Sequence, residues 1–150
     1  MKYVEAPTEY QGKERSLFLA GGITGCPDWQ ADLTDLLRDT DLVLLNPRRT
    51  NFPIPYQKSA QEQIEWEYCH LIKADAISFW FPKETVCPIT LFELGVYLTR
   101  DKPIFIGIHP EYARRRDVEI QTSLANPELE LVYDLNSLSD QIKRRVKNKK

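Results

Sequence analysis

Two glutamates are the residues of this sequence best suited to covalent chemistry. Glu93 lies in the segment ITLFELG, one turn into an expected helix that follows a buried strand. A carboxylate held among apolar side chains costs free energy, so it is typical of a functional site. The second candidate is Glu67 in QEQIEWE. The three glutamates of this segment, Glu62, Glu65 and Glu67, cannot all lie on one helix face, because positions two apart, such as 65 and 67, diverge by about 200°. The pattern turns Glu67 inward, although a solvent-exposed helix acid explains it equally.

Two carboxylates that face one crevice suit glycosyl chemistry. One attacks the anomeric carbon and forms a covalent sugar ester, and the other handles a proton on the leaving group. This chemistry needs neither a metal nor an organic cofactor. The three cysteines lack the paired spacing of a metal site and indicate reduced, cytoplasmic thiols. A nucleophilic Cys87 with His109 as its base is a minor alternative on the same rim.

Short apolar strands alternate with helical patterns along the chain. Strands are expected at 16–20, 42–45, 76–81, 103–108 and 129–133, and helices at 27–37, 60–73, 89–98 and 118–124, with a last helix capped by Ser137. This order predicts an α/β flavodoxin-like three-layer sandwich with a five-stranded parallel sheet in the order 2-1-3-4-5. Residues 1–150 would be one domain, with a loose arm at 1–14 and a basic tail at 143–150.

Three loops after strands should form one rim of this sheet, where ligands bind at the reversal of strand order. Residues 21–25 (GGITG) permit close approach of the backbone to a ligand, or form a simple tight turn. Residues 46–49 (NPRR), followed by Asn51, Phe52 and Tyr56, could stack on a base or hold an anion, or serve solubility. Residues 82–88 lead to Glu93.

Composition and charge exclude several classes of protein and partner. The chain is 42% hydrophobic and 28% charged with a net charge of -2, so nucleic acid polymers are not expected partners. No apolar run approaches the roughly 20 residues of a membrane span, and no signal peptide precedes the first strand. A cytoplasmic protein is expected. A phosphorelay receiver is excluded, because Gly21-Gly22 and Phe81-Pro82 stand where its acids would be.

Several segments together resemble the nucleoside 2-deoxyribosyltransferase superfamily, and most closely its deoxyribosyltransferase-like branch. They are FLAGGITG, LLNPRR, IEWE, ADAISFWFPKETVCPITLFELG and RRDVEIQTSLA, over about residues 17–125. The resemblance implies a flavodoxin-like fold and assembly into dimers or higher oligomers. It also implies transfer of 2-deoxyribose between nucleobases, with hydrolysis when no acceptor base is present.

The resemblance also assigns roles to both glutamates. The nucleophile of the Glu-Leu-Gly motif falls on Glu93, and an acid eight residues before Asp75 falls on Glu67, where the characterised transferases carry Asp. Two positions depart from the pattern: Cys87 replaces an Asp that helps to hold the base, and Phe18 replaces a Tyr that orients the nucleophile. Base recognition is therefore expected to differ.

The resulting hypothesis is an enzyme in which Glu93 attacks C1′ of the sugar and Glu67 assists departure of the base. Its partners would be a small nucleoside or nucleotide and a free nucleobase. The expected substrate-binding residues are Gly21, Gly22 and Ile23 at the sugar, Trp29 and Phe81 stacked on the base, Arg48 on the base or an anionic group, and Asn46, Cys87 and Pro88 beside them. Two alternatives stay open. The arginines suit a deoxynucleoside 5′-monophosphate N-glycosidase, and the two departures suit a non-catalytic nucleotide-binding or sensing module.

Overall fold

The side chains of the central strands divide the core into two halves. In the computed structural model, which describes residues 1–51 and 56–148, β2 (Ser16–Gly21) sends Phe18 and Ala20 into one apolar cluster and Leu17 and Leu19 into the other. Successive side chains of a strand point to opposite faces, so a strand that is apolar at every position must be covered twice. β4 (Ala76–Phe81) follows the same rule and pairs with β2.

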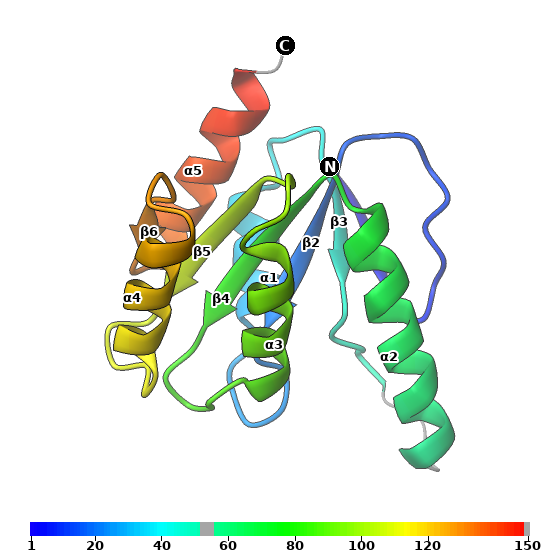
Figure 1. Ribbon diagram of the computed structural model, residues 1–150. Coiled ribbons are helices and arrows are strands. Elements are labelled where there is room, and N and C mark those ends of the chain that lie inside the picture. Colours follow the sequence, from blue (N-terminus) through cyan, green and yellow to red (C-terminus); the bar gives the residue numbers. More distant parts are fainter. Residues whose placement is uncertain (52–55, 149–150) are drawn as a thin grey trace.

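Helices supply both covers (Figure 1). One layer consists of α2 (Tyr56–Lys73), α3 (Pro88–Tyr97) and α4 (Arg115–Ala125), and the other of α1 (Trp29–Leu36) and α5 (Leu135–Lys147). The predicted α/β three-layer class is thereby confirmed.

The sheet has six parallel strands in the order β1-β3-β2-β4-β5-β6. The remaining strands are β1 (Lys2–Glu5), β3 (Val43–Asn46), β5 (Ile104–Ile108) and β6 (Leu131–Val132). The prediction of five strands in the order 2-1-3-4-5 is therefore corrected, because β1 adds a strand outside β3. The five expected strands keep their relative order within this sheet.

The N-terminal arm is not loose as predicted, since residues 2–5 form this additional strand. Lys2 pairs with Val43 and Glu5 with Asn46. The polar composition of the segment concealed the strand, because an edge strand is paired on one side only and needs few apolar residues.

Two helix starts differ from the prediction for the same physical reason. The Asp28 carboxylate accepts a hydrogen bond from the Ala31 N–H at 3.1 Å, so α1 begins after Asp28 rather than at Pro27. Asp134, not Ser137, caps α5, and its carboxylate accepts the Ser137 N–H at 2.7 Å. In each case a carboxylate satisfies an N–H group that the first helical turn leaves free.

The strand order reverses at β2. The chain runs from β2 to β3 on one side and then crosses to β4 on the other side of β2. The loops that follow β2 and β4 therefore meet at this point, where α/β sheets commonly bind ligands.

Candidate active site

Glu67 and Glu93 come from neighbouring helices of the same layer, α2 and α3, and both are half-buried. Burial, and next the negative charge of Glu67, raise the pKa of Glu93 to about 8. Two neighbouring carboxyl groups do not both ionise easily, because like charges disfavour each other. At neutral pH Glu93 therefore favours its protonated form.

Two groups partly offset the effect of burial on Glu67. Burial raises its pKa, but a hydrogen bond from Gln63 and the positive charge of Arg49 act in the opposite direction. Gln63 Nε2 donates to Glu67 Oε1 at 2.7 Å and to the Pro47 carbonyl at 2.6 Å. The guanidinium of Arg49 is buried and pairs with Glu62 at 2.9 Å.

The neighbouring acids of α2 point elsewhere. Glu62 and Glu65 are exposed, and Glu65 accepts a hydrogen bond from Gln61 at 2.8 Å on the solvent side. This burial pattern follows the helical phase and leaves Glu67 as the acid of α2 that interacts with Glu93.

The glycine loop after β2 is used for packing within the protein. A Cβ atom on Gly21 would lie 2.3 Å from the Trp29 ring, and one on Gly22 would lie 2.9 Å from Thr85 and 3.0 Å from the Cys87 sulfur. The Gly22 carbonyl accepts the Trp29 indole N–H at 2.9 Å, and the backbone N–H of Gly22 donates to the Cys87 sulfur. Gly21 and Gly22 thus let two loops approach each other, and the predicted sugar contact through the Gly22 backbone is not available.

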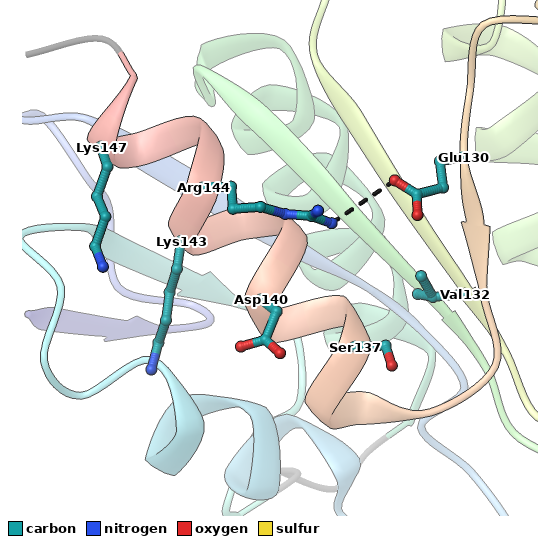
Figure 2. A pocket seen from close by; sticks show the side chains of 7 residues that line it. All are labelled: Glu130, Val132, Ser137, Asp140, Lys143, Arg144 and Lys147. Carbon is teal, nitrogen blue, oxygen red and sulfur yellow. Dashed lines mark ion pairs between the residues drawn. The ribbon is translucent and has the colours of Figure 1, made fainter.

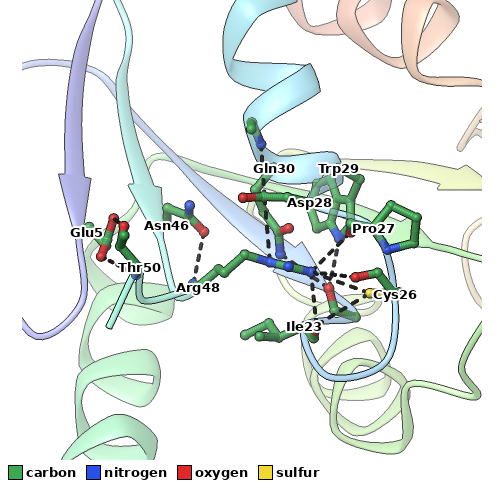
Figure 3. Close-up of polar contacts among 12 residues, drawn as sticks. Glu5, Ile23, Cys26, Pro27, Asp28, Trp29, Gln30, Asn46, Arg48 and Thr50 are labelled. Atoms are coloured by element: carbon green, nitrogen blue, oxygen red, sulfur yellow. Dashed lines mark hydrogen bonds and ion pairs between the residues drawn. The ribbon is translucent and has the colours of Figure 1, made fainter. Parts of the chain in front are cut away.

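Arg48 also has a different task from the predicted one. Its Nη2 donates to the carbonyls of Ile23 at 2.9 Å and Pro27 at 3.0 Å, and Nε lies 3.5 Å from Asp28 (Figure 3). Asn46 is buried; its Oδ1 accepts the Arg48 backbone N–H at 2.9 Å, and its Nδ2 donates to the Tyr3 hydroxyl. Arg48 thus fastens the loop after β2, and Asn46 joins the start of the loop after β3 to β1.

The two aromatic residues expected to stack on a base are inside the core. Trp29 is 2% exposed and Phe81 is 0% exposed. The Phe81 ring lies 5.1 Å from that of Tyr112, and Trp29 fills the space over Gly21. The prediction of base stacking is therefore corrected for both, because neither ring presents a face to a ligand.

The third loop places Cys87 directly before α3. Its backbone lies in the left-handed region at φ 52°, and Pro88 then opens the helix. Burial raises the pKa of the Cys87 thiol to about 11. The thiol contacts Thr85 and Gly22, while His109 Nδ1 accepts the Glu111 N–H at 3.1 Å. The minor alternative of a Cys87–His109 nucleophile gains no support, because the two residues use separate partners and the thiol stays protonated.

Four of the predicted contacts keep some exposed surface: Pro88 is exposed, and Gly21, Ile23 and Arg48 are half-buried. Phe52 lies outside the described residues. Gln63 and Arg49 were missed as site residues by the sequence interpretation. The signal was present for Gln63, because a Gln four residues before a Glu lies on the same helix face and can donate to it.

None of the site residues lines a groove of about 450 Å³ that follows α5 (Figure 2). Its lining residues are Glu130, Val132, Ser137, Asp140, Lys143, Arg144 and Lys147. The charges neutralise each other locally, since Arg144 lies 3.7 Å from Glu130 and Lys143 lies 2.9 Å from Asp39. Among residues 1–51 and 56–148, no helix is long and apolar enough to cross a membrane, and no three potential ligands gather around a metal position.

The sequence matches one known protein family over most of its length. Residues 14–112 match the family described as nucleoside 2-deoxyribosyltransferase like. The chain belongs to this family. The matched residues include both glutamates of the pair and all three loops at the carboxyl ends of β2, β3 and β4.

A solved structure agrees with the fold of this deoxyribosyltransferase-like chain. The crystal structure of a conserved protein from Enterococcus faecalis V583 superposes with a TM-score of 0.66 at 14% identity, covering 87% of this chain and 98% of the other. At that identity the likeness extends to the fold alone. No curated protein matches the sequence.

Proposed function

We propose that this protein cleaves the N-glycosidic bond of a nucleoside or deoxynucleoside and passes the sugar to another base or to water. One observation carries the proposal: α2 and α3 of a deoxyribosyltransferase-like chain each contribute a half-buried carboxyl group, and the charge of Glu67 acts on Glu93. A buried acid whose pKa is raised by a second acid is characteristic of acid–base and glycosyl chemistry.

In the first half of the reaction, Glu93 attacks C1′ of the sugar. A C1′–O bond forms while the C1′–N bond breaks and leaves its electron pair on the base. The attacking carboxyl group must first lose its proton, and the carboxylate of Glu67 is the proposed acceptor. Glu67 then delivers this proton to the departing base nitrogen.

In the second half, a nitrogen of a new base, or water, attacks C1′ and releases the Glu93 carboxylate. The proton of the attacking group passes to Glu67, so the pair again holds one proton. Two displacements at the same carbon give net retention of configuration. The ester and the proton transfers account for the chemistry without a cofactor.

Substrate contacts are proposed for Pro88 at the start of α3, which is exposed, and for Ile23 beside the first loop, which is half-buried. The case for a 5′-phosphate is weaker than the sequence suggested. Arg48 binds backbone carbonyls and Arg49 pairs with Glu62, so the NPRR segment offers no observed reason to prefer a nucleotide over a nucleoside.

The test is incubation with deoxynucleosides and their 5′-monophosphates, with and without a second free base, followed by chromatography of the products. We expect a new deoxynucleoside with the wild-type chain and a rate at least about 1,000-fold lower with Glu93→Ala. Glu65→Ala, which removes an exposed acid of α2, is the matched control and should keep full activity.

Base exchange that survives in folded Glu93→Ala would contradict the mechanism. Release of free base without exchange would instead indicate a hydrolase, and a preference for monophosphates would identify it as a nucleotide glycosidase. Ligand binding without turnover, unaffected by Glu93→Ala, would favour a sensing module.

A further inference from the structure

Gln63 connects the acid pair to the NPRR segment. Its side chain is 8% exposed and its amide nitrogen donates two hydrogen bonds, at 2.7 Å to Glu67 Oε1 and at 2.6 Å to the Pro47 carbonyl. Both partners are acceptors only, so the amide orientation is determined by these contacts. One side chain therefore links the carboxylate on α2 to the backbone that leaves β3.

We infer that Gln63 is a positioning residue, which holds the Glu67 carboxyl group in place for its role in the proposed glycosyl reaction. The inference rests on the proposed function for that role, but the contact itself can be tested without any reaction.

The amide oxygen of Gln63 favours this role over simple packing. It is buried and has no hydrogen-bond partner among the described residues. A buried acceptor without a partner costs free energy, and an apolar side chain of similar length would avoid that cost. The residue is therefore best explained by its two donated bonds, one of which ends on Glu67.

The charge of Arg49 acts on Glu67 in the same direction as this bond. Arg49, from the loop after β3, favours the ionised carboxylate, and Glu67 in turn raises the pKa of Glu93 on α3. The Tyr97 hydroxyl on α3 senses Glu93 as well. Gln63 is the group in this set that contacts the Glu67 oxygen directly, so it can fix the direction of the carboxylate as well as its charge.

The same helix offers a matched control. Gln61 Nε2 donates to Glu65 Oε1 at 2.8 Å, with the same spacing of four residues, on the exposed side of α2. Gln61→Met removes that bond away from the acid pair, and Gln63→Met removes the buried one. The two variants change the same chemical groups at two places on one helix.

The first measurement is the titration of Glu67 in the free protein, by NMR of ¹³C-labelled glutamate carboxyl groups assigned with Glu67→Gln. We expect Gln63→Met to move the midpoint of Glu67 to higher pH, because the carboxylate loses a donor, and Gln61→Met to leave it unchanged. An unmoved midpoint in folded Gln63→Met would overturn the inference. If that variant fails to fold, Gln63→Leu, which also removes the donor without adding a charge, should move the midpoint in the same direction, and an unmoved midpoint there has the same meaning.

The second measurement uses base exchange. We expect Gln63→Met to lower kcat by between about 10-fold and 100-fold with little change in KM, and to move the acidic limb of the pH–rate profile to higher pH. A loss of kcat with an unmoved titration and profile would make Gln63 a structural clamp and overturn the inference. A moved titration with wild-type kcat would leave the positioning intact and overturn the role proposed for Glu67 instead.

Discussion

Glu93 links the stability of this protein to its chemistry. Burial and the charge of Glu67 raise the pKa of its carboxyl group from 4.5 to about 8 on folding. The folded state therefore binds a proton that the unfolded chain has released between these two pH values. The stability from the protonated form is fully present below about 4.5 and is lost as pH rises through about 8. A residue kept at such a cost is expected at a functional site.

We expect Glu93→Gln to stabilise the fold, because the amide cannot ionise in its half-buried position. The gain in free energy of unfolding should be about 2 kcal/mol at pH 8.5 and close to zero at pH 4. Chemical denaturation at both pH values measures it. The exposed Glu65→Gln is the control, and an equal effect of Glu93→Gln at the two pH values would contradict the raised pKa.

At the scale of elements, loops are held by side chains that look like ligand contacts in the sequence. Arg48 joins the loop after β3 to the loop after β2 through carbonyls of Ile23, Cys26 and Pro27 (Figure 3). The N-terminal segment is fixed to α2 in a similar way, since the Trp66 indole donates to the Thr8 carbonyl at 2.8 Å. Backbone groups that no helix or strand satisfies thus obtain side-chain partners.

Replacement of Arg48 by methionine should therefore weaken the fold rather than change substrate charge preference. Loss of several charge-assisted bonds should lower the free energy of unfolding by about 2 kcal/mol and increase proteolysis near Gly25. Arg116→Met, at an exposed position of α4, should change neither. An unchanged stability in Arg48→Met, together with selective loss of activity on monophosphates, would return the arginine to the role of a phosphate ligand.

At the scale of the whole molecule, the two helical layers differ in their outer surfaces. The large hydrophobic side chains that the described helices expose all lie on α2, α3 and α4, and α1 and α5 expose none. They are Ile64, Tyr68, Ile72, Ile89, Phe92, Ile120 and Leu124. These three helices form one layer, with α3 in the middle (Figure 1). A helix that is apolar on its outer side is usually covered by another surface.

We expect a second copy of this chain to cover that layer. Sedimentation or light scattering should give a dimer, and Phe92→Glu should convert it to a monomer by placing charge in the centre of an interface of about 800 Å² per partner. Ile72→Glu tests the same face farther along α2, and Asn136→Glu on α5 is the control. A monomeric wild-type chain, or a dimer that survives both variants, would contradict this assignment of the interface.

The sequence by itself determined the elements and their layers. Apolar runs such as residues 76–81 demanded a sheet covered on both faces, and alternating strands and helices demanded parallel pairing. It also singled out Glu93 as an acid among apolar side chains, whereas helix phase left Glu67 open and the family resemblance favoured it. What it could not reveal was β1, since pairing along one edge leaves little apolar pattern in residues 2–5.

Only the tertiary structure decided how the loop residues are used. Arg48, Trp29 and Phe81 have the chemistry of ligand contacts, but their partners come from segments distant in sequence, and those partners occupy them. The contact between Gln63 and Pro47 joins α2 to the end of β3 in the same way. The local sequence pattern indicates which kinds of contact a side chain can make. Which of these contacts it does make depends on the groups that the fold brings within hydrogen-bonding distance.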